Sequence, residues 1–372
     1  APKEMTPVQR AYHKIRFSGL IVDKNNPRSR FFAIYHAFML NYVGLASAIA
    51  LIKGEQSLVD FVQVLGVAMI YINNVVKAAN VFLHQNEIKE LFARMDKFSL
   101  DVTHDEAEEH IELRPKNLQT KFISLISNVL VYLPPFSLAI GVLSDYLTDF
   151  VKPHLPFQLW IPWRMTAFWP YFAAMVFDTL LTETTGYYYM SFTTLLFTFT
   201  TELNACVRVL RHRLETNGPA DENVYRYHQM ILKLLKDYNK MFSGPVYWEI
   251  LISTLQPLGF IYAFLKLLKR KDPASTEVII KALLCLGAPF VPCSCGQAIS
   301  TQMERLHASA YLGKWYEEKP KIRKNLVTLL TVTTQKTDLN YRKFISYNFA
   351  CYATVIQGIY SYLMMIIQFD DD

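Results

Sequence analysis

Residues 344–369 read FISYNFACYATVIQGIYSYLMMIIQF and contain no charged side chain. At about 1.5 Å per residue, one helix of this length crosses a bilayer core of roughly 30 Å. Several polar and sulfur-containing side chains in it recur at three- and four-residue spacing, so they share one helix face. These are Gln357, Tyr360, Ser361, Met364, Met365 and Gln368. Such a face on a membrane helix lines either water or another helix, and the stretch alone leaves both open.

The composition indicates a polytopic membrane protein. The 372 residues are 52% hydrophobic, 14% aromatic and only 19% charged, and the mean hydropathy is +0.14. This is more apolar than an ordinary soluble protein. The net charge of +6 is small and spread along the chain, which gives no nucleic-acid-binding surface.

No motif of a known catalytic type is present. The chain has no phosphate loop, zinc-protease motif or nucleophile elbow, so we do not expect an enzyme. Cys293 and Cys295 are two residues apart, but no partner follows at zinc spacing. No metal or other cofactor is therefore expected.

Apolar segments predict an all-α membrane protein with seven transmembrane helices. They cover roughly 31–52, 57–85, 121–146, 167–214, 221–268, 276–306 and 344–369. The fourth and fifth are too long for one bilayer, so we expect part of each to project into water. The charged stretch 86–119 is expected to connect two helices, with its acidic run as a solvated loop.

The distribution of lysine and arginine predicts the orientation. With the N-terminus inside, the inner segments hold 29 of these residues and the outer segments 7. Because cytoplasmic segments carry the excess of basic residues, we expect a cytoplasmic N-terminus and an extracellular C-terminus. The expected organisation is a cytoplasmic tail (1–30), helices one to four (31–214), helices five and six (215–306), a cytoplasmic anchor helix (307–336), the last helix (337–369) and an extracellular tail (370–372).

Several short sequence motifs, taken in their order along the chain, resemble those of the insect odorant receptor family. They are Trp160-Ile-Pro-Trp163, Cys293-Ser-Cys-Gly-Gln297, Ser309-Ala-Tyr311 before Trp315, Leu329-Leu330, Gln335-Lys336, Tyr360-Ser-Tyr362 and the closing Gln368. With seven spans and an inside N-terminus, the resemblance covers essentially the whole chain. The short loop at about 215–221 resembles an odour-tuned subunit, because the shared co-receptor of the family has a much longer loop there.

The resemblance implies an odorant-gated, non-selective cation channel in the plasma membrane, in the dendrite of an olfactory neuron. The chain would form a heterotetramer with the odorant co-receptor, surrounded by membrane lipid, and would bind a small volatile but no nucleic acid. The last helices would line a central pore, with Met365 at a hydrophobic gate where the family commonly has Val. Its neighbours at the gate would be Leu363, Met364, Ile366 and Gln368.

The resemblance places the odorant pocket in the outer half of the subunit, among helices two, three, four and six. The residues that fit it are Tyr71, Val75, Phe136, Ser137, Ile140, Gly141, Ser144, Thr184, Tyr188, Phe192, Ile279 and Ala282. Tyr and Phe dominate this set, which suggests a small aromatic odorant. An apolar volatile would be held by burial, at roughly 25 cal/mol per Å², with few polar contacts.

Two other functions remain open from the sequence. The closing segment 362–369, YLMMIIQF, also resembles the C-terminal motif of gustatory receptors. This resemblance would make the chain a gustatory-type ligand-gated channel. A secondary transporter is the rival from a different class. It should show matched halves with broken helices, and only the breaks at Pro134-Pro135 and Gly287-Ala288-Pro289 are found.

Overall fold

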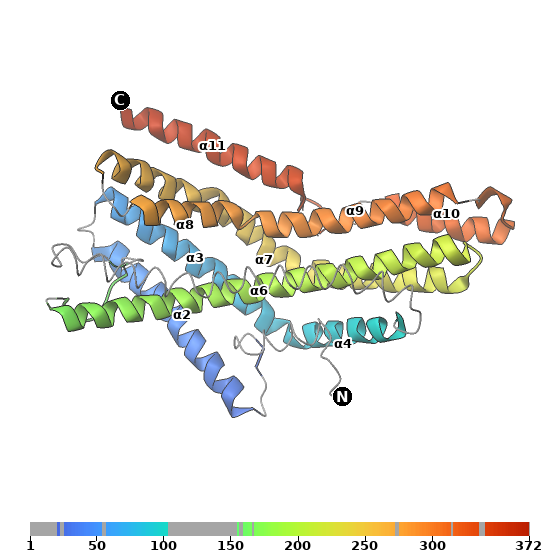
Figure 1. Ribbon diagram of the computed structural model, residues 1–372, viewed down its shortest axis with the longest axis horizontal. Coiled ribbons are helices and arrows are strands. Elements are labelled where there is room, and N and C mark those ends of the chain that lie inside the picture. Colours follow the sequence, from blue (N-terminus) through green and yellow to red (C-terminus); the bar gives the residue numbers. More distant parts are fainter. Residues whose placement is uncertain are drawn as a thin grey trace.

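The computed structural model describes residues 21–22, 26–53, 57–102, 155, 159–165, 167–271, 275–313, 315–334 and 339–371. These residues are almost entirely helical (Figure 1). The helices are α2 (Pro27–Lys53), α3 (Leu58–Leu83), α4 (Gln85–Val102), α6 (Phe168–Asn217), α7 (Glu222–Lys269), α8 (Ser275–Gly287), α9 (Phe290–Leu312), the 3-10 turn η1 (Trp315–Glu317), α10 (Pro320–Thr334) and α11 (Phe349–Asp371). Strands β1 (Asn340–Tyr341) and β2 (Ile345–Ser346) form an antiparallel hairpin before α11. The expected third helix, 121–146, lies outside the described residues.

Helices α6 and α7 run side by side along the long axis of the molecule (Figure 1). They have 50 and 48 residues, so each is about 70–75 Å long. This is more than twice a bilayer core, so the prediction that both helices outrun the membrane is confirmed. Gly218 turns the chain between them with φ at +75°, which a glycine adopts without strain. Asp221 then caps α7 by accepting a hydrogen bond from the Asn223 amide at 2.9 Å.

Five stretches of the described chain are long and apolar enough to cross a membrane. They are Pro27–Lys53, Leu58–Leu83, Glu222–Lys269, Ser275–Leu312 and Phe349–Gln368. Helix α6 is less apolar because it is rich in threonine, but these hydroxyls bond to their own helix. Thr185 and Thr200, for example, donate to the carbonyls of Leu181 and Leu196 at 2.7 and 2.9 Å. A helix polar in composition can therefore still sit among apolar neighbours.

Helix α4 corrects the expectation that 86–119 only connects two helices. Ile88, Leu91, Phe92 and Met95 are buried, and their spacing of i, i+3, i+4 and i+7 is that of one helix face. The ring of Phe92 lies 4.6 Å from that of Phe199 on α6. The many charges of this stretch concealed an amphipathic helix. The acidic run 105–112 lies outside the described residues.

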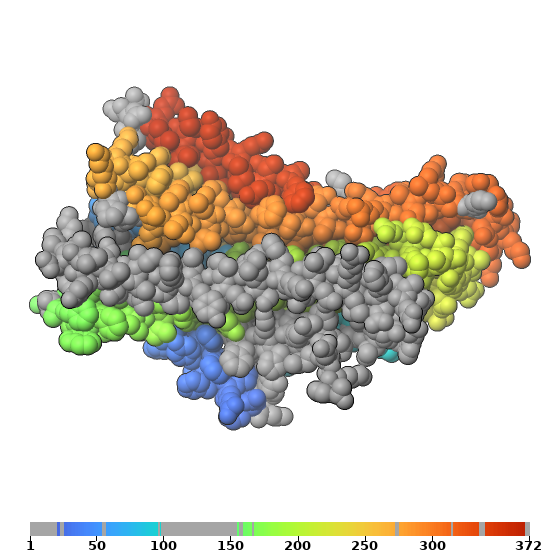
Figure 2. All heavy atoms as spheres, in the orientation of Figure 1, coloured from blue at the N-terminus to red at the C-terminus, as the bar shows by residue number. Residues whose placement is uncertain are grey.

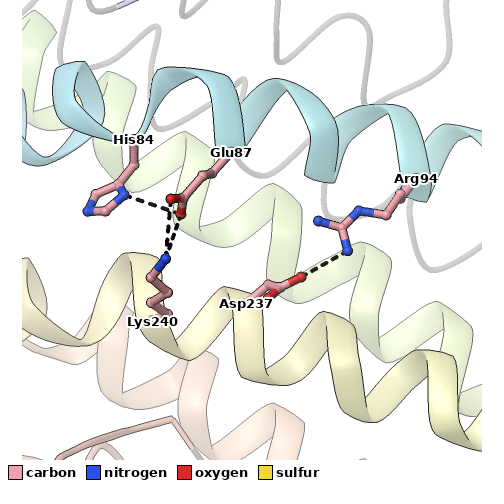
Figure 3. A network of polar contacts seen from close by, with 5 residues as sticks. All are labelled: His84, Glu87, Arg94, Asp237 and Lys240. Atoms are coloured by element: carbon pink, nitrogen blue, oxygen red, sulfur yellow. Dashed lines mark hydrogen bonds and ion pairs between the residues drawn. The ribbon is translucent and has the colours of Figure 1, made fainter.

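Ion pairs hold the polar face of α4 to α7 (Figure 3). Glu87 accepts from Lys240 at 3.2 Å and lies 3.2 Å from the Nδ1 of His84, and Arg94 meets Asp237 at 2.9 Å. The hydrogen bond from Lys240 lowers the pKa of the Glu87 carboxyl. These groups are largely exposed, so they set the position of α4 more than they stabilise it.

Two segments expected as continuous helices are interrupted. The sixth predicted helix divides into α8 and α9, because Pro289 and Pro292 lack the N–H groups that would continue the backbone ladder. The last helix begins at Phe349 rather than at residue 344. Arg342 and Lys343 have positive φ in the hairpin turn, and the Asn348 side chain caps α11 by accepting from the Cys351 amide at 2.9 Å.

A close backbone contact fixes the start of α11 on α9. A Cβ at Gly296 would overlap the carbonyl oxygen of Tyr347, so only glycine allows this approach. Tyr347 is itself fully buried, and its hydroxyl donates to the Ser243 carbonyl of α7 at 2.8 Å. The start of the last helix is therefore held by both α9 and α7.

Gly296→Ala should destabilise the protein by about 1–3 kcal/mol, because the added methyl must displace backbone rather than a flexible side chain. The measurement is the melting temperature of the purified protein in detergent. Gly244→Ala on α7 is the matched control, since a Cβ there meets open space. It should be neutral or slightly stabilising. Equal melting temperatures for the two variants would contradict the contact.

Candidate functional site

Helix α11 lies on the outside of the bundle, where Figure 2 shows it beside α8 and α9. Only 11% of its apolar window is buried, with Val355 and Ile359 facing the other helices. Of the residues expected at the gate, Leu363 packs against the core, whereas Met364 and Met365 are about half exposed. Ile366 is partly buried and Gln368 is exposed. A long apolar helix left uncovered in a single chain needs lipid, solvent or other subunits around it.

The pocket residues expected on α3 and α6 pack into one core cluster. Tyr71 and Val75 of α3 lie against the cluster that contains the buried Tyr188 and Phe192 of α6. The Tyr71 ring fills the space beside Gly44 of α2, and a Cβ there would overlap it. We call these four residues, three of them aromatic, the aromatic region of α3 and α6.

The other expected pocket residues fall into three groups. Ile279 and Ala282 of α8 pack in a separate cluster with Val59 of α3 and Phe260 of α7. Thr184 is buried and donates its hydroxyl to the Leu180 carbonyl of its own helix at 2.8 Å. The residues expected on helix three lie outside the described residues: Phe136, Ser137, Ile140, Gly141 and Ser144. The described chain thus brings together only part of the predicted set.

An aromatic contact between α2 and α6 was missed by the sequence analysis. The His36 ring stacks on Tyr187 with 5.7 Å between centroids and an interplanar angle of 11°. It meets Tyr188 edge-on at 5.9 Å. The run of three tyrosines at 187–189 was the available signal, because successive residues on a helix point to different neighbours. His36 and Tyr187 thereby extend the aromatic region around Tyr188.

A buried ion pair lies at the centre of the helical bundle. Lys77 of α3 and Glu249 of α7 are 3.1 Å apart, and each side chain is only 2% exposed. The Tyr189 hydroxyl of α6 donates to the other Glu249 oxygen at 2.7 Å. The Lys77 ammonium also lies 3.9 Å from the Tyr189 ring centroid and 5.2 Å from that of Phe192. We call Lys77, Glu249 and Tyr189 the polar node.

The polar node joins three helices and contacts the expected pocket. Among the described residues, each charge of the pair meets its opposite charge only within the node, so exposing either one to water would require repacking of α3, α6 and α7. Phe192 belongs both to the pocket set and to the surroundings of Lys77. The sequence shows the two charges inside predicted spans, but it does not show that they meet across 172 positions of chain.

A groove of about 430 Å³ separates α11 from α3 and α7. It is lined largely by apolar residues of α3 and α7, and Ile366 is its contact on α11. The Cβ position of Gly358 lies 3.9 Å from Thr254 of α7, so the two helices approach each other there. The groove begins beyond this approach, where α11 diverges from the bundle (Figure 1). The outer part of α11 therefore has room to move against α7.

Three comparisons bear on identity. The family model described as 7tm Odorant receptor matches residues 57–360. Odorant receptors 85b and 85c of Drosophila melanogaster are 22% and 21% identical to this chain, over 58% and 57% of it. The matches cover 57% and 56% of those receptors, so the chain spans a little over half the length of the curated relatives it matches.

Solved structures share the fold over nearly the whole chain. The olfactory receptor OR5 from the insect Machilis hrabei in complex with eugenol matches with a TM-score of 0.78 at 14% identity, and each chain is 97% covered. A second structure of the same receptor gives a TM-score of 0.70 with the same coverage. The expected all-α, seven-helix membrane fold is therefore confirmed. Since the family model covers most of the sequence, the chain belongs to the insect odorant receptor family.

Proposed function

We propose that this chain is the odour-tuned subunit of an odorant-gated, non-selective cation channel that assembles with a co-receptor into a tetramer. The observation that carries this proposal is the exposed α11, a membrane-length helix with almost no cover from its own chain. Four such helices around one axis would cover each other's apolar faces and leave one face toward a central pore. Membership of the odorant receptor family agrees with this arrangement.

The proposed orientation has the N-terminus in the cytoplasm and the C-terminus outside, in a multi-pass protein of the plasma membrane. The turn between α6 and α7, and helix α10, lie at one end of the molecule, whereas the end of α11 lies at the other (Figure 1). The first end carries the segments rich in lysine and arginine, which favours the cytoplasmic side. There α9 is tied to α10 by His307 and Thr333 at 2.9 Å and to α6 by Ser309 and Glu215 at 2.7 Å. This tied group of helices is a rigid cytoplasmic anchor for the pore.

The gate in this proposal is a ring of apolar side chains on α11 centred on Met365. A narrow apolar ring excludes ions because water leaves it, and an amide ring at Gln368 beyond it would replace hydration water without selecting strongly among cations. Met364 and Met365 are about half exposed, so the other helices of the chain leave their side chains partly uncovered. Movement of α11 into the groove at Ile366 would widen such a ring.

Met365→Ala should raise the current without odorant several-fold, because a shorter side chain leaves a wider and wetter ring. The measurement is whole-cell current at matched surface expression, with Met365→Leu as the control of nearly equal volume. A basal current that is unchanged in Met365→Ala would remove Met365 from the gate.

The proposed odorant pocket includes the aromatic region around Tyr71, Val75, Tyr188 and Phe192. Burial of apolar surface supplies the affinity there, and the Tyr188 hydroxyl can supply one directional hydrogen bond. The olfactory receptor OR5 from Machilis hrabei, which shares this fold, was solved in complex with eugenol, an aromatic compound. A small aromatic odorant is therefore the ligand class that we propose for this chain.

Cells that express this chain with the odorant co-receptor should give cation currents to eugenol or acetophenone, and weaker ones to octyl acetate and octanoic acid. Aromatic volatiles match the aromatic wall by stacking as well as by burial. The measurement is whole-cell current, with cells expressing either chain alone as controls. Strong responses restricted to the aliphatic ester or acid would contradict the aromatic assignment.

The same recordings separate the alternatives. Current from this chain alone would indicate a self-sufficient channel of the gustatory type. Good surface expression without current under any condition would overturn the channel proposal and favour a transporter.

A further inference from the structure

The break between α8 and α9 leaves backbone carbonyl groups without their usual partners. Helix α8 ends at Gly287 and α9 begins at Phe290. In a continuous helix, the amide of residue 292 would donate to the carbonyl of Ala288, but residue 292 is proline and has no N–H. Ala288 is partly buried, and its carbonyl can accept a hydrogen bond only from a donor outside this helix.

Two tyrosine hydroxyls from different helices reach the carbonyls of this break. Tyr189 of α6 lies 3.4 Å from the Ala288 oxygen, and Tyr352 of α11 lies 3.3 Å from the Leu286 oxygen. Both distances are longer than the usual 2.7–2.8 Å of an O–H···O bond. The contacts are therefore weak in this arrangement and would strengthen with a small shift of the break.

Tyr189 has two competing acceptors. A phenol has a single O–H, and here it donates to Glu249 at 2.7 Å rather than to Ala288 at 3.4 Å. The position of Glu249 is in turn set by its ion pair with Lys77. A movement of α3 or of Phe192 that shifts Lys77 would change how strongly Glu249 holds the Tyr189 hydroxyl.

The far side of the break packs directly on the start of α11. The ring of Phe290, the first residue of α9, stacks on Phe349 with 6.0 Å between centroids. It also meets Tyr352 edge-on at 5.5 Å. Phe349 and Tyr352 form the first turn of α11, so a rotation of the break would tilt the pore-lining helix.

We infer that the break between α8 and α9 is the hinge that transmits rearrangement of the odorant pocket to α11. Tyr189 is the positioning residue on the pocket side and Tyr352 on the pore side, while Glu249, held by Lys77, competes with the Ala288 carbonyl for the Tyr189 hydroxyl. The gating role of this hinge rests on the proposed channel function. Its mechanical part, two hydroxyls that hold one backbone break, does not.

The test uses Tyr189→Phe, Tyr352→Phe and the double variant, because each substitution removes only a hydroxyl. Tyr311→Phe on α9 is the matched control, since this tyrosine is 60% exposed and distant in sequence from the break. Each variant is expressed with the co-receptor, and the half-maximal concentration is measured for whichever of eugenol and acetophenone gives the larger current. Surface expression is measured in parallel.

Tyr189→Phe and Tyr352→Phe should each raise the half-maximal concentration about 3- to 10-fold, the scale of one hydrogen bond. The double variant should be no worse than the stronger single one, because both hydroxyls act on one hinge. Tyr311→Phe should equal the wild type. Two results would overturn the hinge and leave the proposed function intact, provided that the wild type responds to odorant. In the first, neither single variant changes the half-maximal concentration. In the second, the fold-changes of the two single variants multiply in the double variant.

Hydrogen exchange of the purified complex in detergent tests the mechanical part without any current. Peptides that cover residues 284–293 should exchange at least about 3-fold faster in Tyr189→Phe and Tyr352→Phe than in Tyr311→Phe. Unchanged exchange would overturn the hinge. If the wild type gives no odour-evoked current but exchange at the break is faster, the proposed function fails and the hinge stands.

Discussion

The arrangement of this bundle depends on one buried ion pair between Lys77 and Glu249. Two charges in apolar surroundings are tolerated only as a pair, and removal of one partner from such a pair typically costs about 3–5 kcal/mol. The pair, with the Tyr189 hydroxyl, joins α3, α6 and α7 through directional polar contacts, so any packing of these helices must keep the three groups together. The aromatic region on one side and the α8–α9 break on the other both take their places from it.

Many other polar groups in the bundle are satisfied within their own helix, so they do not select a neighbouring helix. The threonines of α6 donate to their own helix, so they permit burial without selecting a neighbour. The ion pairs between α4 and α7 are partly exposed and screened by salt, so they contribute little to stability. Among the described residues, the polar node joins α3, α6 and α7, and the hydroxyls of Tyr189 and Tyr352 join α6 and α11 to the carbonyls of the α8–α9 break. This difference separates groups that can transmit a change from groups that only fill space.

The sequence predicted the long helices well, because hydrophobic length and the Asn217-Gly218-Pro219 turn are local signals. It missed α4, whose apolar spacing at Ile88, Leu91 and Phe92 was hidden among charges. It also placed the start of the last helix too early, because absence of charge says nothing about the turn that precedes a cap.

For the pocket, helix positions could be assigned, but not which helix faces meet. Hence Ile279 and Ala282 fall in a different cluster from Tyr188. The Lys77–Glu249 contact is a property of the fold and has no local sequence signal.

The weakness of α11's attachment follows from its sequence and has a functional consequence. Its start is held tightly, by the Gly296 contact and by buried Tyr347, whereas beyond Gly358 it faces a groove. A helix anchored at one end and loose at the other responds to a small rotation at its base with a larger displacement at its tip. The expected gate residues lie near that tip, with Met365 about 24 Å from Phe349 along the helix axis. Few apolar contacts oppose the movement, so a pocket ligand needs only a modest preference for the tilted state to shift the equilibrium.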